Sequence, residues 1–292
     1  MISPLNEGPI RPVSSPVSGP VCDAPADAAE MARLLPAVEA LARAAGAVIL
    51  EVYASDFDVS AKADTSPVTV ADERAEALIT PALQALTPAW PVVAEEAAAR
   101  GQAPAAARTF WLVDPLDGTR EFVQRNGQFT VNIALVHDGA PVLGVVLQPV
   151  GDVLYAGIVG QGAWCDRAGQ RGALQVGPVP AAGWRLAASR SHGDEAALQA
   201  WLQTGLGSVA GGLPVAGRVN AGSSLKFGLL ACGEADVYPR LGRTMEWDTA
   251  AGHAVLAAAG GRVCTLDGAS LRYGKPGYEN PHFVAWAGTG PS

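Results

Sequence analysis

The sequence predicts a fold of mixed helices and strands, built as one domain or as two that pack closely. The chain has 292 residues, 49% of them hydrophobic, which is enough material for a large core. Apolar residues recur at helical spacing early in the chain, and short apolar runs typical of strands follow them. Past Gly172 strands and helices alternate, and this change of pattern predicts a boundary near residues 160–180.

The first elements are expected to be two helices behind a disordered tail. Residues 1–28 are rich in Pro, Ser and Gly and are expected to form that tail. The first helix is expected over residues 34–52, with Pro36 in its first turn, where a missing backbone N–H is harmless. The second is expected after the segment SPVTVAD, from Glu73 to Leu86.

Strands are expected wherever short apolar runs are bounded by turn residues. The segment HDGAP joins two of these runs as a β-hairpin. The last helix is expected to begin with Asp248 as its N-cap and to end at Gly260 and Gly261. The expected strands cover residues 91–94, 110–113, 130–136, 142–147, 153–158, 185–188 and 235–238, and two further helices cover residues 195–202 and 223–231.

Composition excludes several functional classes. The formal charge is −8, from 20 basic and 28 acidic residues, and no basic cluster stands out. This argues against a binder of nucleic-acid polymers or membrane surfaces. The four cysteines show no CxxC spacing, which fits a reducing compartment, and the four scattered histidines argue against a zinc site. No apolar run in the sequence is long enough for integral membrane association.

The segment WLVDPLDGT (residues 111–119) is the first of four that carry candidate chemistry. A buried strand is expected to end at Asp114, because Pro115 turns the chain. Gly118 permits a backbone conformation that other residues resist. The alternative is that Asp117 and Gly118 form a plain tight turn without a function.

Two carboxylates three residues apart on such a turn, those of Asp114 and Asp117, can converge on one point. Magnesium prefers oxygen ligands of this kind, and the carbonyl of Leu116 offers a further one. The amides of Gly118 and Thr119 are then free to face a phosphate. The segment therefore predicts a metal site beside a phosphate site.

Three further acidic residues each have a functional and a structural interpretation. Glu95 follows a short apolar run and belongs either to the same acidic site or to a solvated loop. Asp72 is either a base that orients water or a helix cap, at near capping-box spacing from Thr69. Asp248 is either an N-cap or part of a helix N-terminus that binds phosphate, and these two roles can coexist.

In this order and with these neighbours, the segments resemble the inositol monophosphatase superfamily of metal-dependent, lithium-sensitive phosphatases. The resemblance covers residues 30–286 and is strongest to the branch of bacterial 3′(2′),5′-bisphosphate nucleotidases. The matching motifs are AKADTSPVTVAD (61–72), AEE (94–96), WLVDPLDGT (111–119), GSSLKF (222–227), ADVYPRLG (235–242) and WDTAAG (247–252).

The resemblance implies a layered α+β fold, an αβαβα sandwich of the inositol monophosphatase and fructose-1,6-bisphosphatase type. It implies an N-terminal metal-binding subdomain over residues 29–170 and a C-terminal substrate-specificity subdomain over residues 171–292. It also implies two or three Mg²⁺ ions, with Lys62 and Asp64 on a loop that would serve a third. The implied metal ligands are Glu95, Asp114, the Leu116 carbonyl, Asp117 and Asp248, and the implied catalytic residues are Asp72, Thr119 and Glu95, with Asp72 and Thr119 orienting and deprotonating the attacking water.

The same resemblance implies that Lys226 and Arg240 supply cations for a second phosphate of the substrate. The alternatives are that both are ordinary surface cations and that His192 is merely a loop histidine. The implied substrate-binding residues are Gly118, Thr119, Ser189, His192, Ser223, Lys226, Arg240 and Asp248.

The expected reaction is hydrolysis of the 3′-phosphate of adenosine 3′,5′-bisphosphate to AMP and phosphate by metal-activated water, a step in sulfur metabolism. The second expected substrate is 3′-phosphoadenylyl sulfate. Two alternatives remain open: a phosphatase of inositol 1-phosphate or sugar phosphates, and a catalytically silent regulator that binds metal or nucleotide. The expected location is the cytoplasm, with or without loose attachment to the inner membrane.

Overall fold

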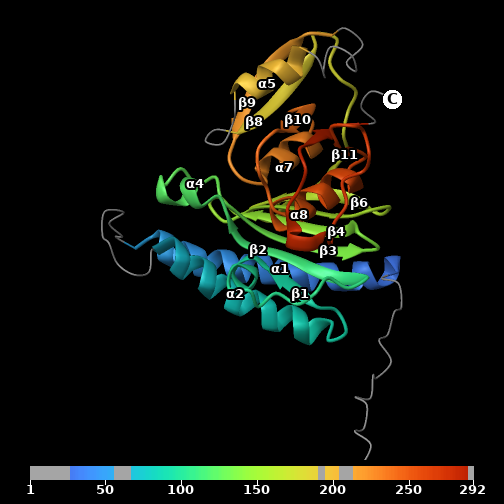
Figure 1. Ribbon diagram of the computed structural model, residues 1–292. Helices are drawn as coiled ribbons and strands as arrows, with labels where there is room; N and C mark the ends of the chain where they lie inside the picture. Colours follow the sequence, from blue (N-terminus) through green and yellow to red (C-terminus); the bar gives the residue numbers. More distant parts are fainter. Residues whose placement is uncertain (1–26, 56–66, 190–194, 204–212, 289–292) are drawn as a thin grey trace, which may run out of the picture.

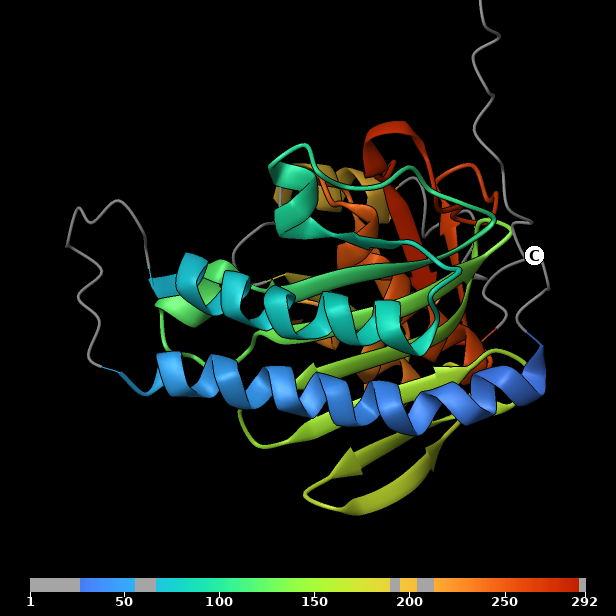
Figure 2. The ribbon, with the colours of Figure 1, turned by 90° about the horizontal axis from the view of Figure 1, so that it is seen from below.

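Two long helices, α1 (Ala28–Tyr53) and α2 (Pro67–Leu86), lie side by side against one face of a large sheet (Figures 1 and 2). The tail predicted for residues 1–28 lies almost wholly outside the described residues. The structure is a computed structural model that describes residues 27–55, 67–189, 195–203 and 213–288.

Both helices begin earlier than the apolar pattern predicts. Asp27 caps α1 by accepting a hydrogen bond from the amide of Glu30 (2.7 Å), so Pro36 lies inside the helix rather than in its first turn. α2 begins at Pro67, whose missing N–H is harmless at a helix start. The predicted start at Glu73 is therefore wrong, because residues 67–72 already form the first turns of α2.

The large sheet contains seven strands in chain order, β1-β2-β3-β4-β5-β6-β7. β1 pairs with β2 in parallel, and every other neighbouring pair is antiparallel. The five strands expected in this region and the hairpin between β3 and β4 are confirmed, whereas β6 and β7 were not predicted. The strands are β1 (Val92–Ala94), β2 (Thr109–Asp117), β3 (Thr130–His137), β4 (Ala140–Gln148), β5 (Val153–Ile158), β6 (Gly162–Arg167) and β7 (Gln170–Leu174).

A second sheet has five strands in the order β11-β12-β10-β8-β9. The strands expected near β8 and β10 and the helices expected near α5 and α7 are confirmed. The strands are β8 (Trp184–Ser189), β9 (Val215–Ala221), β10 (Val237–Arg240), β11 (Arg262–Thr265) and β12 (Phe283–Trp286), and the helices are α5 (Glu195–Trp201), α7 (Leu225–Ala231), α8 (Glu246–Ala258) and the 3₁₀ turn η2 (Pro276–Tyr278). Among the helices in the described ranges, none is both long and apolar enough to cross a bilayer.

The two sheets and the helices stack in five layers (Figure 1). One apolar cluster joins α1 and α2 to the large sheet, and a second joins that sheet to α7, α8 and the second sheet. A third cluster, which includes Trp184, Leu198 and Trp286, joins α5 to the outer face of the second sheet. The expected αβαβα sandwich is confirmed, and α7 and α8 form its middle layer.

The middle layer lies very close to the large sheet at Gly144 on β4. A β-carbon at Gly144 would lie 2.3 Å from the carbonyl oxygen of Ala251 on α8, which is far inside contact distance. The backbone fixes the position of a β-carbon, and the Ala251 carbonyl is itself backbone, so no rotamer change relieves the clash. The absence of a side chain at Gly144 thus sets the depth at which α8 packs.

Candidate active site

A cavity of about 380 Å³ opens where the end of β2, the start of α8 and the segment before α7 meet. It brings together most of the residues predicted from the sequence. His192, Lys62 and Asp64 lie outside the described residues. The cavity is lined by Glu95, Asp114, Leu116, Asp117, Gly118, Thr119, Arg120, Glu121, Ser189, Ser223, Lys226, Phe227, Tyr238, Arg240, Arg243, Thr244, Asp248 and Thr249.

The strand β2 continues through Pro115 to Asp117, so the prediction that it ends at Asp114 is wrong. The pairing of β2 with β3 is irregular between Asp114 and Asp117, and this irregularity accommodates the proline. The side chain of Asp114 is 1% exposed and accepts a hydrogen bond from the Leu116 amide (3.0 Å). Both carboxylates line the cavity, which a functionless tight turn would not require.

Gly118 is a position at which the chain needs glycine. Its φ is +103°, and a β-carbon there would lie 3.2 Å from both the Phe129 backbone and the Ser223 hydroxyl. The chain then enters the short helix α4 (Thr119–Val123). The conformational role predicted for Gly118 is therefore present, and it places Thr119 at the cavity.

Glu95 is the first residue of the short helix α3 (Glu95–Ala99) and is half-buried at the cavity rather than part of a solvated loop. The helix start is held by Glu76 on α2. The Glu76 carboxylate accepts a hydrogen bond from the Glu96 amide (2.8 Å) and pairs with Arg100 (3.1 Å). A buried acid on one helix thus fixes where the next one begins.

Asp72 lies inside α2 and not at its N-terminus, so the alternative that it caps the helix is wrong. Its side chain is buried. It does not line the cavity itself, but it is close enough to Glu95 and Glu96 for their charges to raise its pKa. Asp72 therefore lies near the acidic wall of the cavity, the group formed by the carboxylates of Glu95, Asp114, Asp117 and Asp248.

Asp248 is the third residue of α8, and the N-cap is Met245, which corrects the predicted helix start. The carboxylate of Asp248 still satisfies the helix end, because one oxygen accepts a hydrogen bond from the Met245 amide (2.8 Å). The residue also lines the cavity. The structural and functional roles expected for Asp248 coexist, but from a different helix position.

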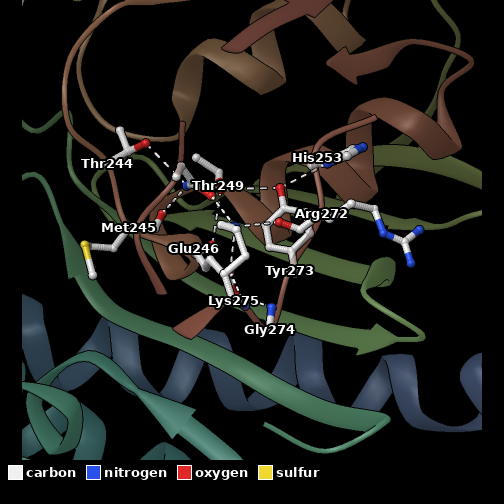
Figure 3. A network of polar contacts seen from close by, with 10 residues as sticks. Thr244, Met245, Glu246, Thr249, His253, Arg272, Tyr273, Gly274 and Lys275 are labelled. Atoms are coloured by element: carbon white, nitrogen blue, oxygen red, sulfur yellow. Dashed lines mark hydrogen bonds and ion pairs between the residues drawn. The ribbon is translucent and has the colours of Figure 1, made fainter. Parts of the chain in front are cut away.

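A polar network anchors the start of α8 to residues 272–280 (Figure 3). The carboxylate of Glu246 is 0% exposed and accepts hydrogen bonds from the amides of Gly274 (2.6 Å) and Lys275 (2.9 Å). The Lys275 ammonium pairs with the same carboxylate at 2.6 Å. Asn280 donates to the Met245 carbonyl at 2.7 Å. These contacts fix the helix end that carries Asp248.

Burial and mutual repulsion make this group of acids hard to ionise together. Burial, reinforced by neighbouring carboxylates, raises the pKa of Asp72 to about 9. Burial likewise raises the pKa of Glu95 to about 7, with Asp117 adding to the shift. The pKa values of Asp114 and Asp248 rise well above their usual range, again chiefly through burial. Such a cluster is stabilised by a positive charge within it.

The donor set suits a hard divalent cation. All the candidate donors are carboxylate or carbonyl oxygens, which is the chemistry that magnesium selects. In the described part of the chain, no three Asp, Glu, His or Cys side chains already surround one ready-made ion position. The residues therefore fit Mg²⁺ by chemistry and charge.

The metal-free protein is expected to lose stability, relative to an Asp72→Asn variant, as the pH rises. The pKa of Asp72 increases from 3.8 to about 9 on folding, so the unfolded chain releases this proton first. Below the unfolded pKa, Asp72 is protonated in both states and does not lower the free energy of unfolding. As the pH rises from there towards about 9, the loss of folding stability caused by the buried carboxyl grows. Unfolding in EDTA should show an advantage of Asp72→Asn that increases by up to about 1.4 kcal/mol per pH unit. A difference that stays flat with pH would contradict the buried neutral acid.

Lys226 is not a surface cation, which corrects one alternative. Its side chain is 3% exposed, its ammonium donates to the Ser223 carbonyl (2.5 Å), and it lies 5.2 Å from the ring centre of Tyr238. Burial lowers its pKa to about 8. Arg240, at the end of β10, is half-buried and lines the same cavity. The cavity is thus lined by both carboxylates and cations.

Several residues at the site were not predicted from the sequence. Arg120 and Arg243 add cations to the cavity lining, and Thr244 and Thr249 lie beside Asp248 in it. Ser224 and Asn132 form hydrogen bonds behind Asp117. The sequence did contain an indication for Asn132, because it is a polar residue within an apolar run, and a buried polar side chain needs a hydrogen-bond partner.

The chain is similar to known proteins over most of its length. The sequence pattern of the inositol monophosphatase family matches residues 30–287. The 3′(2′),5′-bisphosphate nucleotidase CysQ of Escherichia coli (strain K12) is 46% identical over 246 residues, 83% of this chain and 95% of that protein. CysQ of Buchnera aphidicola is 40% identical over 244 residues, 82% of this chain and 88% of that protein.

Solved structures resemble the fold over most of its length. The crystal structure of CysQ from Bacteroides thetaiotaomicron, described as a bacterial member of the inositol monophosphatase family, has a TM-score of 0.73 and 36% identity. It covers 88% of this chain, and 97% of that chain is matched. Mycobacterium tuberculosis SuhB has a TM-score of 0.66 and 28% identity, over 88% of this chain and 91% of that one.

Proposed function

Because the chain belongs to the inositol monophosphatase family, we propose that it is a phosphatase that hydrolyses the 3′-phosphate of adenosine 3′,5′-bisphosphate to AMP and phosphate. The relatives named 3′(2′),5′-bisphosphate nucleotidase match most of the chain. The observation that carries the proposal is that the buried Lys226 and the half-buried Arg240 line the same cavity as the carboxylates. A substrate with two phosphates matches this lining, with one phosphate at the metal-binding carboxylates and the other at the two cations.

The acidic wall is proposed to bind magnesium. Glu95, Asp114, Asp117, Asp248 and the carbonyl of Leu116 would hold two or three Mg²⁺ ions. When bound, the ions would neutralise the carboxylates, attract the phosphate and lower the pKa of a water molecule. Without such a countercharge the same carboxylates would repel an anionic ester. The ligands that the resemblance implies therefore also carry the negative charge that a divalent cation would neutralise.

The remaining residues are proposed to bind and orient. Asp72 and Thr119 would orient the attacking water, and the ionised form of Asp72, which a positive charge among the neighbouring carboxylates favours, would accept the proton of that water. Glu95, as part of the acidic wall, would place its carboxylate next to that water. Gly118, Thr119, Ser189, Ser223, Asp248 and the predicted His192 would contact the substrate, with Lys226 and Arg240 at its second phosphate.

The subdomain division, residues 29–170 for metal and 171–292 for specificity, is part of the proposal. It is supported by Lys226 and Arg240, which both come from the second part, although Asp248 comes from there as well. A cytoplasmic location and a role in sulfur metabolism are inferred from the substrate. Attachment to the inner membrane has no supporting observation.

A panel of substrates tests the proposal directly. With Mg²⁺, phosphate release should be fastest from adenosine 3′,5′-bisphosphate, followed by 3′-phosphoadenylyl sulfate, and slowest from inositol 1-phosphate. Lys226→Met should lower kcat/KM for the bisphosphate by about tenfold or more, the effect of losing one charged contact. Its kcat/KM for inositol 1-phosphate should change little, because that substrate has no second phosphate.

Two outcomes would contradict the assignment. A preference for inositol 1-phosphate or a sugar phosphate would favour the alternative phosphatase and remove the role of Lys226. Magnesium binding without turnover of any ester would favour a silent regulator. Including Li⁺ in parallel reactions checks that the measured release belongs to this lithium-sensitive type of site.

A further inference from the structure

A buried serine lies between the two halves of the acidic site. Ser224 is 2% exposed and directly precedes α7. Its hydroxyl lies 2.6 Å from the carbonyl oxygen of Asp248 and 3.0 Å from a carboxylate oxygen of Asp117. The side-chain amide of Asn132 donates to it at 2.9 Å. We infer, on the basis of the proposed function, that Ser224 is a positioning residue that fixes Asp117 and Asp248 relative to each other for Mg²⁺ binding.

The hydrogen-bond inventory explains why a hydroxyl is needed there. The Asn132 amide nitrogen can only donate, so the oxygen of Ser224 accepts from it. The single proton of Ser224 is then available to the Asp117 carboxylate or to the Asp248 carbonyl, both of which can only accept when Asp117 is ionised. Without this donor, two negatively polarised oxygens would face each other in a buried space.

The elements involved come from two adjacent layers of the sandwich. Asp117 ends β2 in the large sheet, whereas Asp248 belongs to α8 in the middle layer. Asn132 lies on β3 and is almost fully buried, so the donor is fixed in place. Ser224 contacts the carboxylate of Asp117 and the backbone carbonyl of Asp248, so its position helps to set the spacing of these two candidate ligands.

The backbone that carries Ser224 is itself held. The preceding Ser223 has a φ of +56°, a conformation that costs energy for a residue other than glycine. Its hydroxyl donates to the carbonyl of Asp117 (2.6 Å) and lies 2.9 Å from the Thr130 hydroxyl. The strained residue is thus anchored to β2 and β3, which keeps Ser224 aimed at the acidic wall.

Ser224→Ala is expected to weaken Mg²⁺ binding by about 10- to 100-fold, as for other residues that orient metal ligands. Calorimetric titration of the full chain with Mg²⁺ alone, without substrate, measures this directly. The rise of the thermal midpoint on adding Mg²⁺ should shrink in parallel. Ser224→Thr keeps the hydroxyl and should bind Mg²⁺ within about threefold of the wild type, since it retains the orienting donor.

A matched control separates positioning from general stability. Thr87 is another buried hydroxyl that donates to a carbonyl, that of Leu83 (3.1 Å), and accepts from a side-chain N–H, that of Trp111 (2.8 Å). It does not line the cavity. Thr87→Val should lower the thermal midpoint in EDTA as Ser224→Ala does, but should leave the Mg²⁺ dissociation constant unchanged.

The outcomes are distinguishable from failure of the proposed function. If Mg²⁺ binds the wild type and Asp117→Asn weakens it while Ser224→Ala does not, the positioning role is wrong and the metal site stands. If the wild type binds no Mg²⁺, or Asp117→Asn binds it normally, the proposed ligand assignment itself fails. If Ser224→Ala does not fold, Asn132→Ala tests the same contact, and an unchanged Mg²⁺ affinity in it would overturn the inference.

Discussion

Asp114→Asn is expected to lower kcat by about 10³-fold, the upper end of what losing one charge-stabilising group costs an enzyme. Asp114 is central to the acidic wall, since burial and the charges of Glu95, Asp117 and Asp248 all raise its pKa. The substitution keeps the shape and removes one negative charge. Phosphate release from adenosine 3′,5′-bisphosphate over a range of Mg²⁺ concentrations measures the loss.

The same substitution is expected to stabilise the metal-free fold. A neutral amide avoids ionising a buried group among other carboxylates, so the thermal midpoint in EDTA should rise at neutral pH. Asp236 provides the matched control, because it is also 1% exposed but pairs with Arg185 at 2.6 Å. Asp236→Asn should therefore lose stability and keep kcat. Normal turnover with normal Mg²⁺ demand in Asp114→Asn would show that Asp114 is not a ligand.

Lys275→Met is expected to lower the free energy of unfolding by about 3 kcal/mol, the cost of leaving a buried charge without its partner. The Lys275 ammonium pairs with Glu246, whose carboxylate is wholly buried beneath the start of α8. Two backbone amides still donate to Glu246 in the variant, so the loss is placed at the lower end of the known range. Urea denaturation in EDTA measures the change.

The control for this prediction is an exposed ion pair. Arg74 and Glu51 lie 2.8 Å apart, with side chains 48% and 65% exposed. Arg74→Met should change the free energy of unfolding by at most about 1 kcal/mol, because solvent screens such pairs. Equal losses in Arg74→Met and Lys275→Met would contradict the view that residues 272–280 anchor α8 through Glu246.

The strongly periodic and apolar elements could be predicted from the sequence. α1 was found because its buried residues recur at helical spacing, and β2 to β5 were found because they are short apolar runs that are buried almost throughout. Element ends were predicted less well. Asp27 starts α1 through one side-chain contact, and β2 passes through a proline that normally ends a strand.

The acidic residues of the site could be predicted from the sequence, but the residues that position them through hydrogen bonds could not. The candidate ligands lie within short sequence motifs, which can be recognised without knowing what packs against them. Glu76, Ser224 and Asn132 hold those candidates through contacts between elements far apart in the chain. β7 and β9 were missed because most of their residues are exposed and interrupt the apolar pattern. β6, β11 and the wholly buried β12 were not predicted either.

The carboxylates that line the cavity come from positions far apart in the sequence, from Glu95 to Asp248. During translation the early acids leave the ribosome long before α8 and the segment that anchors it have been synthesised. The acidic site is therefore complete only after most of the chain has been synthesised. A product truncated before residue 272 would keep every carboxylate that lines the cavity but would lack the segment that anchors the start of α8.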